Sequence, residues 1–473
     1  MKIAIVGASG FVGSQLLNKI TSTYQCQALS RSTPPVSGNY KWNKCDLHNL
    51  KDLEQGLSGC NVAIYLVHSM LASSGLNQGK FQDFDISLAD NFARAAKSSG
   101  IERVIYLSGI IPDSNLSAHL KSRLEVENLL GSYFPKMTTL RAGLIIGDKG
   151  SSFTMMYRLA RKLPIMLCPS WTKTLSQPIY IEDVVRSIEY CLSDDLTHGK
   201  TYDIGSPTAT SYEAMMKLIG SRISREPKIF HIDTIYPTLS SLWVTLISGA
   251  PLELTRPLVG SLKEPMLVRK DCKLPFSESF LEFPEALDRV LESSELEKFK
   301  PPHAFKVWIK RQKQKHVRSI QRLTAPNHWN VERLSEEYAK WLPKIMKGAI
   351  RTEVTEKSIS FKIALTNLEL LKLSISKDRT DCTRRLFYIT CGLLVSSSNE
   401  KGRLEFRALP NSDHVLVAIH DFIPSLPWPV YRFTQAIVHK WVMMRFGEHL
   451  NNIPRDNQSS ALSKNLKSQK GAS

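Results

Sequence analysis

The chain has 473 residues, too many for a single hydrophobic core, so two or three domains are expected. Apolar residues make up 42% of it and charged residues 22%, proportions that exclude wholesale disorder. The net charge is +18, and nine Lys or Arg without any acid lie between Lys298 and Arg322. We expect no nucleic-acid partner, because no nucleic-acid-binding motif is recognisable. This basic segment is either a solvated linker or a weak contact with an anionic membrane.

The N-terminal sequence MKIAIVGASG has too short an apolar run for a signal peptide, and no stretch reaches the length of a membrane span. The eight cysteines are scattered, without a Cys-x-x-Cys pair or a histidine at ligand spacing. This pattern favours reduced thiols and predicts no metal site. We therefore expect a cytoplasmic protein that is soluble or at most peripheral.

Short apolar strands alternate with helical segments through the first part of the chain. Strands are predicted at residues 2–6, 26–29, a short stretch ending at 45–47, 62–67, 104–108 and 138–142. Helices are predicted at about 81–99 and 117–130, before the last two of these strands. This alternation is typical of an α/β fold with a parallel, doubly wound sheet covered on both faces, the Rossmann type.

Changes of pattern divide the chain into four parts. Residues 1–290 are predicted to form the Rossmann domain with a helical substrate lobe, and 291–338 a basic linker. Residues 339–452 are predicted to form an α+β domain, because apolar residues alternate strictly in several stretches, the period of half-buried antiparallel strands. Those stretches are 359–365, 371–375, 404–408 and 415–419. Residues 453–473 are polar and basic without periodicity, which predicts a disordered tail.

The last predicted helix covers residues 429–450. It places Val430, Phe433, Ile437, Trp441 and Met444 on one stripe. We expect this stripe to lie in the core, with the sheet wrapped around the helix.

A glycine loop follows the first strand directly and opens the first helix. Its glycines are Gly7, Gly10 and Gly13. In this context Gly7 permits the turn, Gly10 lets backbone N–H groups approach a pyrophosphate, and Gly13 lets the helix pack close to the strand. The helix N-terminus also favours the phosphates. The loop therefore predicts a dinucleotide site, to which we also assign Ser9, Phe11 and Val12.

The end of the second predicted strand distinguishes NADP from NAD. Ser30 and Arg31 stand where an acidic residue would bind the ribose hydroxyls of NAD. Because a guanidinium suits a 2′-phosphate, NADP(H) is predicted, with NAD(H) as the alternative if Arg31 is an ordinary exposed arginine.

Four further residues at strand ends are assigned to the same site. Asp46 could accept a hydrogen bond from the adenine amino group, or it could cap a helix. His68 follows the fourth strand, in the crevice where ligands of open α/β sheets bind. The remaining two assignments are Leu47 and Gly143.

The glycine spacing resembles that of extended and atypical short-chain dehydrogenase/reductases. Those enzymes have a Ser near the fifth strand and a Tyr-x-x-x-Lys on the next helix, where Tyr donates a proton and Lys lowers its pKa and holds the ribose. Ser108 matches the serine, but His119 and Arg123 stand where Tyr and Lys are expected. The resemblance implies Ser108, His119 as general acid and Arg123 as ribose ligand. The alternative is that the active pair is lost, because an arginine cannot be deprotonated.

A second Tyr-x-x-x-Lys string runs from Tyr40 to Lys44. It is predicted to precede the third strand, from where it cannot face the nicotinamide.

Longer segments narrow the resemblance: YLVHSM (65–70), HLKSRLEVE (119–127), LPIMLCPSWTKTLSQPIYIEDV (163–184), TYDIGSP (201–207) and RPLVGSLKEPMLVRKD (256–271). They resemble a bacterial group of NAD(P)-binding proteins related to NmrA-like regulators and to the dinucleotide-binding accessory subunit of respiratory complex I. Its members carry a C-terminal domain of unknown function, similar to the START-like helix-grip fold that shelters apolar ligands.

Two functions follow from this resemblance. The first is an NADP(H)-dependent oxidoreductase acting on an apolar carbonyl, enone or quinone-like small molecule. The second is a non-catalytic protein that senses NADP(H) or assists the assembly of a respiratory complex.

Overall fold

The computed structural model describes residues 1–31, 40–68, 76–113, 116–232, 244–293, 316–326 and 329–453. The chain divides into two compact units. The first consists of residues 1–71 and 84–310, and the second of residues 72–83 and 311–473. Each unit has a hydrophobic core of its own.

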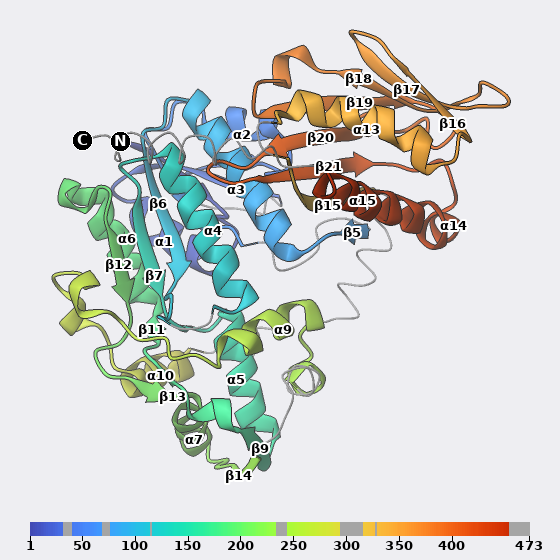
Figure 1. The fold of residues 1–473 in the computed structure, drawn as a ribbon. Helices are drawn as coiled ribbons and strands as arrows, with labels where there is room; N and C mark the ends of the chain where they lie inside the picture. Colours follow the sequence, from blue (N-terminus) through green and yellow to red (C-terminus); the bar gives the residue numbers. More distant parts are fainter. Residues whose placement is uncertain are drawn as a thin grey trace, which may run out of the picture. The chain divides into compact units, whose positions relative to one another are not determined.

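A wholly parallel seven-stranded sheet, in the order β12-β7-β6-β4-β1-β2-β3, forms the centre of the first unit (Figure 1). The strand order reverses between β1 and β4, which creates a crevice at the carboxyl ends of the strands. The predicted doubly wound α/β fold is confirmed. The strands are β1 (Lys2–Val6), β2 (Gln25–Ser30), β3 (Tyr40–Lys44), β4 (Val62–Tyr65), β6 (Arg103–Gly109), β7 (Thr138–Ala142) and β12 (Thr201–Ile204).

Helices cover both faces of this sheet. On one face α1 (Phe11–Ile20) and α6 (Ile181–Ser193) pack against apolar residues of the central strands. On the other face lie α2 (Leu50–Leu57), α3 (Phe81–Ser98) and α4 (Ala118–Tyr133), and the rings of Tyr65 and Phe92 pack there 4.7 Å apart. The string from Tyr40 to Lys44 forms the edge strand β3 itself, rather than preceding it.

A helix-rich lobe completes the first unit, as expected after residue 150. Its helices are α5 (Ser151–Lys162), α7 (Tyr212–Arg222), α9 (Leu252–Ser261) and α10 (Phe283–Glu292). Short strand pairs that the sequence did not signal tie the lobe together. They are β8 (Ile145–Ile146) with β11 (Ile179–Tyr180), β9 (Ile165–Pro169) with β14 (Lys228–Ile232), and β10 (Leu175–Ser176) with β13 (Thr210–Ser211).

An eight-stranded sheet, in the order β16-β17-β18-β19-β20-β21-β15-β5, forms the second unit. Its strand pairs are antiparallel except for β15 with β5. The core lies between the sheet and the helices α13 (Val331–Ile345), α14 (Trp428–Phe433) and α15 (Gln435–Asn451). The four predicted strands are present as β17 (Ser358–Ile363), β18 (Glu369–Ile375), β20 (Arg403–Ala408) and β21 (His414–Phe422), beside β5 (Leu76–Gln78), β15 (Val317–Thr324), β16 (Ile350–Val354) and β19 (Arg384–Cys391).

Part of the segment predicted as a basic linker folds within the second unit. β15 pairs with β21, and α13 begins at Val331, so the prediction of a linker up to residue 338 is wrong. The Arg318 side chain is buried, and its Nη2 lies 2.6 Å from Oδ1 of Asp421. The sequence pattern did not reveal the pairing of Arg318, because its acidic partner lies far away in the sequence. Residues 294–315 of the predicted linker, and 454–473 of the predicted tail, lie outside the described residues.

The prediction that the C-terminal apolar stripe lies in the core is wrong. The helix breaks at Thr434 (φ −124°, ψ −88°), so α14 and α15 are not one continuous helix. α15 faces the core with Ala436, Val442, Met443, Phe446 and Leu450, whereas the five stripe residues are exposed. Large apolar residues occur on both the buried and the exposed side of α15. Their spacing in the sequence therefore did not show which side is buried.

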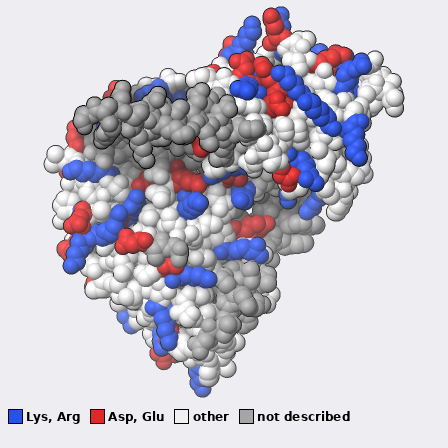
Figure 2. Space-filling view, viewed as in Figure 1, with Lys and Arg blue, Asp and Glu red and all other residues white. Residues whose placement is uncertain are grey.

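Charges of both signs are interspersed over the described surface on the face drawn in Figure 2. That face shows no continuous basic stripe among the described residues. In the described parts of the chain, no helix combines the length and apolar character needed to cross a bilayer.

Candidate functional site

The glycine loop has the geometry that a dinucleotide cradle needs. Gly7 has φ +94°, which favours glycine, and a Cβ on Gly13 would lie 2.6 Å from the Gly7 carbonyl oxygen. Gly10 is the N-cap of α1 and offers no side-chain cap, so the first-turn N–H groups of this helix have no capping side chain. At this loop a phosphate could reach both the backbone N–H groups of the turn and the uncapped N-terminus of α1.

The end of β2 lies beside the same loop. The hydroxyl oxygens of Ser9 and Ser30 are 2.5 Å apart, which joins the loop to the strand end. Arg31 is the next residue and is exposed. Residues 32–39, which follow it, lie outside the described residues.

Asp46 and Leu47 lie where β3 leads into α2. Asp46 Oδ1 accepts a hydrogen bond from the His48 N–H at 3.1 Å, which closes a turn. The N-cap of α2 is Asn49, so the alternative that Asp46 caps a helix is wrong. Leu47 is buried, and its carbonyl accepts a hydrogen bond from Asn91 Nδ2 at 2.9 Å. The contacts of Asp46 and Leu47 with adenine stay predictions.

His68 is held by a carboxylate that the sequence did not single out. Its Nδ1 is 2.7 Å from Oδ2 of Asp85, a buried residue of α3, and Ser122 Oγ donates to the same oxygen at 3.1 Å. A carboxylate at Nδ1 places the proton of a neutral imidazole on that nitrogen and leaves Nε2 as the acceptor. That Nε2 is buried and makes no hydrogen bond within the described residues.

His119 lies against His68. The N-cap Ser117, whose Oγ accepts from the Leu120 N–H at 3.2 Å, starts α4 so that His119 falls in its first turn. The two imidazole centroids are 4.8 Å apart. His119 Nδ1 is buried, and no hydrogen-bond partner for it occurs in the part of the chain that the structure describes.

The protonation state of His119 follows from this environment. Burial lowers its pKa well below the usual range, His68 and Arg123 act in the same direction, and Asp85 opposes them. His119 is therefore a neutral imidazole at physiological pH, suited to donating a hydrogen bond rather than to delivering a proton from an imidazolium.

Arg123 is engaged by the backbone of the sheet. Its Nη1 donates to the Val67 carbonyl at 3.2 Å, its Nη2 donates to the Leu107 carbonyl, and its guanidinium carbon lies 4.9 Å from the Tyr106 ring centroid. The side chain thus joins the carboxyl ends of two neighbouring strands. A ribose-binding role for Arg123 stays a prediction beside this structural one.

Replacing Arg123 with Ala should lower the free energy of unfolding by about 2–4 kcal/mol, because the buried Leu107 carbonyl and the half-buried Val67 carbonyl lose their donor. Thermal or denaturant unfolding measures this change. Lys121→Ala, at an exposed position of the same helix, is the matched control and should change stability by less than about 0.5 kcal/mol. Unchanged stability with weakened NADPH binding would instead assign Arg123 to the ribose.

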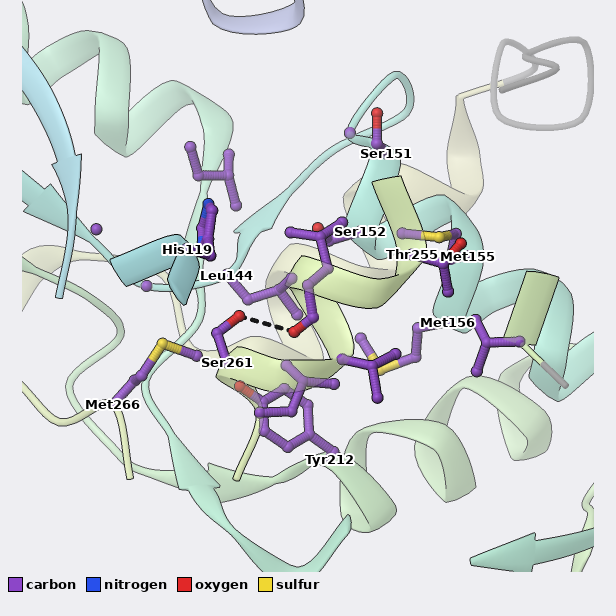
Figure 3. Close-up of a pocket in the computed structure, with 18 of the residues that line it drawn as sticks. His119, Leu144, Ser151, Ser152, Met155, Met156, Tyr212, Thr255, Ser261 and Met266 are labelled. Carbon is purple, nitrogen blue, oxygen red and sulfur yellow. Dashed lines mark hydrogen bonds between the residues drawn. The ribbon is translucent and has the colours of Figure 1, made fainter. Parts of the chain in front are cut away.

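An apolar cavity of about 310 Å³ opens beside these residues (Figure 3). Phe11 from the start of α1, Gly109 and Ala142 from the ends of β6 and β7, and His119 form its sheet side. A Cβ on Gly143 would lie 2.1 Å from the Gln177 carbonyl oxygen, so only glycine fits there. The lobe closes the cavity with Met155, Met156, Trp171, Tyr212, Met216, Leu258, Val259 and Met266.

The lining sets limits on the ligand. No Asp, Glu, Lys or Arg is among the described lining residues, and His119, the one histidine among them, is neutral at physiological pH. A diphosphate or a sugar needs charged or numerous polar partners when buried. Hydroxyl groups and an indole N–H add some polarity to the walls, through Ser151, Ser152, Trp171, Tyr212, Thr255 and Ser261. The described walls therefore suit a largely apolar molecule with a few hydrogen-bonding atoms.

The structure brings together some predicted site residues and not others. The glycine loop, Phe11, Gly143 and His119 meet around the cavity or beside it, and His68 joins through the ring of His119. Ser108 is buried at the end of β6 but is not a lining residue. The sequence analysis missed Asp85 and Ser122. The sequence did contain a signal for Asp85, because an acidic residue in the first turns of an otherwise apolar helix face is unusual.

Residues 7–143 match a family model described as NAD(P)H-binding. This part of the chain is a domain of the NAD(P)H-binding type. Auxiliary protein GraX of Staphylococcus aureus is 28% identical over 132 residues, covering 28% of this chain and 42% of that protein. The mitochondrial NADH dehydrogenase [ubiquinone] 1 alpha subcomplex subunit 9 of Mus musculus is 23% identical over 214 residues, covering 43% and 56%. The chain thus spans about half the length of these relatives.

Solved structures also resemble the chain. Citrobacter sp. triphenylmethane reductase complexed with NADP(H) is 14% identical with a TM-score of 0.49, covering 61% of this chain and 100% of that one. A UDP-N-acetylglucosamine 4-epimerase from Bacillus cereus is 18% identical with a TM-score of 0.46, covering 61% and 95%.

Proposed function

We propose that the first unit binds NADP(H) and reduces an apolar carbonyl, enone or quinone-like compound. The observation that carries this proposal is the cavity of about 310 Å³, which is lined both by Phe11 next to the glycine loop and by His119. Ligands of open α/β sheets bind at this carboxyl edge. A largely apolar cavity with a few hydrogen-bonding groups is typical of a small-molecule site.

The residues of the loop fit the cofactor. Gly7, Gly10 and Gly13 leave room for the pyrophosphate at the N-terminus of α1, and Ser9, Phe11 and Val12 belong to the same turn. Arg31 and Ser30 would hold a 2′-phosphate at the end of β2. When bound, NADPH would supply a hydride.

The side chains of this unit contribute binding, orientation and polarity. Neutral His119 donates a hydrogen bond to the substrate oxygen and stabilises the negative charge that develops there. The proton that completes the reduction comes from solvent water when the product leaves the cavity. Asp85 holds His68, and His68 packs against His119 and fixes its ring. The methionines and aromatic residues of the lobe exclude water from the cavity.

A panel of quinones, enones and aldehydes tests the proposal through NADPH oxidation. Ser152→Phe, which fills the cavity from α5, should raise KM for bulky substrates by roughly tenfold or more and leave the NADPH Kd unchanged. Ser193→Phe places the same side chain at an exposed position of α6 and should change neither constant. Equal effects of the two variants, or no oxidation of any substrate, would contradict the proposal.

The cofactor preference is tested separately. NADPH should bind roughly tenfold or more tightly than NADH, because Arg31 can pair with the 2′-phosphate. Arg31→Ala should remove this difference by weakening NADPH alone, as fluorescence titration measures. Arg31→Lys keeps the charge and should retain part of the preference. Tighter NADH binding by the unchanged protein would assign the site to NAD(H).

A second candidate is an NADP(H)-binding protein without turnover. The absence of the Tyr-x-x-x-Lys pair on α4 and the engagement of Arg123 by backbone carbonyls favour it. Two relatives are named an auxiliary protein and a subunit of NADH dehydrogenase, which would suit a sensing or assembly role. Tight NADPH binding with no oxidation of any panel member would select this candidate.

The second unit extends the first proposal. We propose that it is a START-like domain that shelters an apolar ligand in a cavity of about 170 Å³ between the sheet and the helices. Tyr338, Phe361, Phe422 and Val442 line this cavity.

The cytoplasmic location of the protein also stays a proposal.

A further inference from the structure

α14 and α15 expose an unusual amount of apolar surface. Phe433 is 73% exposed, Ile437 57% and Met444 54%, and smaller fractions of three neighbours are exposed as well. We define the apolar face as Val430, Phe433, Ile437, Val438, Trp441 and Met444. On α15 the positions 437, 441 and 444 repeat at helical spacing, so their side chains form one stripe. Val430 and Phe433 belong to α14, which precedes the break at Thr434.

Single exposed apolar residues are common, but contiguous ones indicate a contact. Burial of Ala436, Val442, Met443, Phe446 and Leu450 on the other side of α15 already fixes this helix to the second unit. The apolar face is therefore not needed to hold the helix in place. The apolar face is therefore available for a contact with a surface outside the described structure.

The charges around the apolar face indicate what that is. Arg432, Lys440 and Arg445 are exposed on the same two helices. Glu448 is the one acid between residues 428 and 451, and its Oε2 is paired with Arg445 Nη1 at 2.7 Å. In sequence, residues 428–473 contain seven Lys or Arg and two acids. Cations thus surround the apolar face and continue along the chain beyond it.

We propose that α14 and α15 dock on an anionic lipid surface through the apolar face. Phe and Trp beside aliphatic side chains, flanked by Lys and Arg, are the composition of helices that lie in the interface of a bilayer. A second copy fits less well, because joining two identical faces would bring cations against cations. Arg318 of the basic segment is buried and cannot serve this contact. The membrane contact predicted for that segment stays a prediction.

Flotation of the full-length protein with lipid vesicles tests this proposal. The protein should bind phosphatidylcholine vesicles that contain phosphatidylglycerol and bind pure phosphatidylcholine vesicles far less. Phe433→Ser combined with Ile437→Ser should reduce binding roughly tenfold or more without a change in melting temperature, because both side chains are exposed. Leu365→Ser, at a 97% exposed position of the same unit, is the matched control and should bind normally.

Three results would overturn it. Full binding by the double variant, with loss of binding in high salt, would leave only non-specific electrostatic attraction. Failure of the unchanged protein to bind anionic vesicles would exclude the membrane. A dimer in solution that the double variant disrupts, without vesicle binding, would assign the apolar face to a second copy.

Discussion

Gly10→Asp should weaken NADPH binding by more than about 100-fold while leaving the fold as stable as before. A carboxylate about 5 Å from a phosphate charge costs roughly 3 kcal/mol at an effective dielectric of about 20, which corresponds to that change in Kd. The fold should tolerate the residue, because Gly10 is the N-cap of α1 with φ −73° and aspartate is a preferred N-cap. A Cβ there would lie 3.1 Å from the Gly7 carbonyl oxygen, so the loop needs only a small shift to accept it. Fluorescence titration measures binding, and thermal unfolding measures stability.

Gly10→Asn is the matched control for the charge. Asparagine has nearly the same shape as aspartate and can cap the helix. Any NADPH affinity that Gly10→Asp loses beyond the loss in Gly10→Asn must therefore come from the charge of the carboxylate. We expect Asn to bind NADPH at least tenfold more tightly than Asp does. If both variants bind as well as the unchanged protein, the pyrophosphate does not lie at this loop.

His119→Ala should reduce turnover by roughly 10²–10³-fold, the usual effect of removing one hydrogen-bond donor at a developing oxyanion. The NADPH Kd should be nearly unchanged, because the residue lines the substrate cavity rather than the glycine loop. His119→Gln, which keeps a neutral N–H donor, should recover part of the rate. Steady-state kinetics with the best substrate of the panel measures both.

The pH dependence separates a neutral donor from a general acid. Since burial lowers the pKa of His119 well below its usual range, the neutral form persists through the neutral pH range, and protonation sets in only in acidic solution. The rate should therefore be flat across neutrality and fall only in acid. A step near pH 6.5 that disappears in His119→Gln would show instead that a titrating imidazole transfers the proton.

Local patterns predicted the part of the site that lies in one stretch of sequence. The glycine loop works through a turn, a helix start and a close packing contact within seven residues, so its pattern was readable. The parallel sheet was readable for the same reason, because each buried strand is a short apolar run.

The parts that depend on distant residues were not readable. Asp85 contacts His68 from another element. Arg318 forms a hydrogen bond with Asp421, which lies on another strand 103 positions further along the chain. The apolar wall of the cavity comes from helices whose methionines are indistinguishable in sequence from core residues. The buried side of α15 depended on a break at Thr434 that no proline or glycine marks.

A crystal structure of the protein with NADP⁺ tests the central claim most directly. We expect the pyrophosphate over Gly7, Gly10 and Gly13, the 2′-phosphate beside Arg31, and the nicotinamide at the mouth of the apolar cavity next to His119. A dinucleotide whose nicotinamide points away from that cavity, or a cavity closed by side chains in the complex, would contradict it.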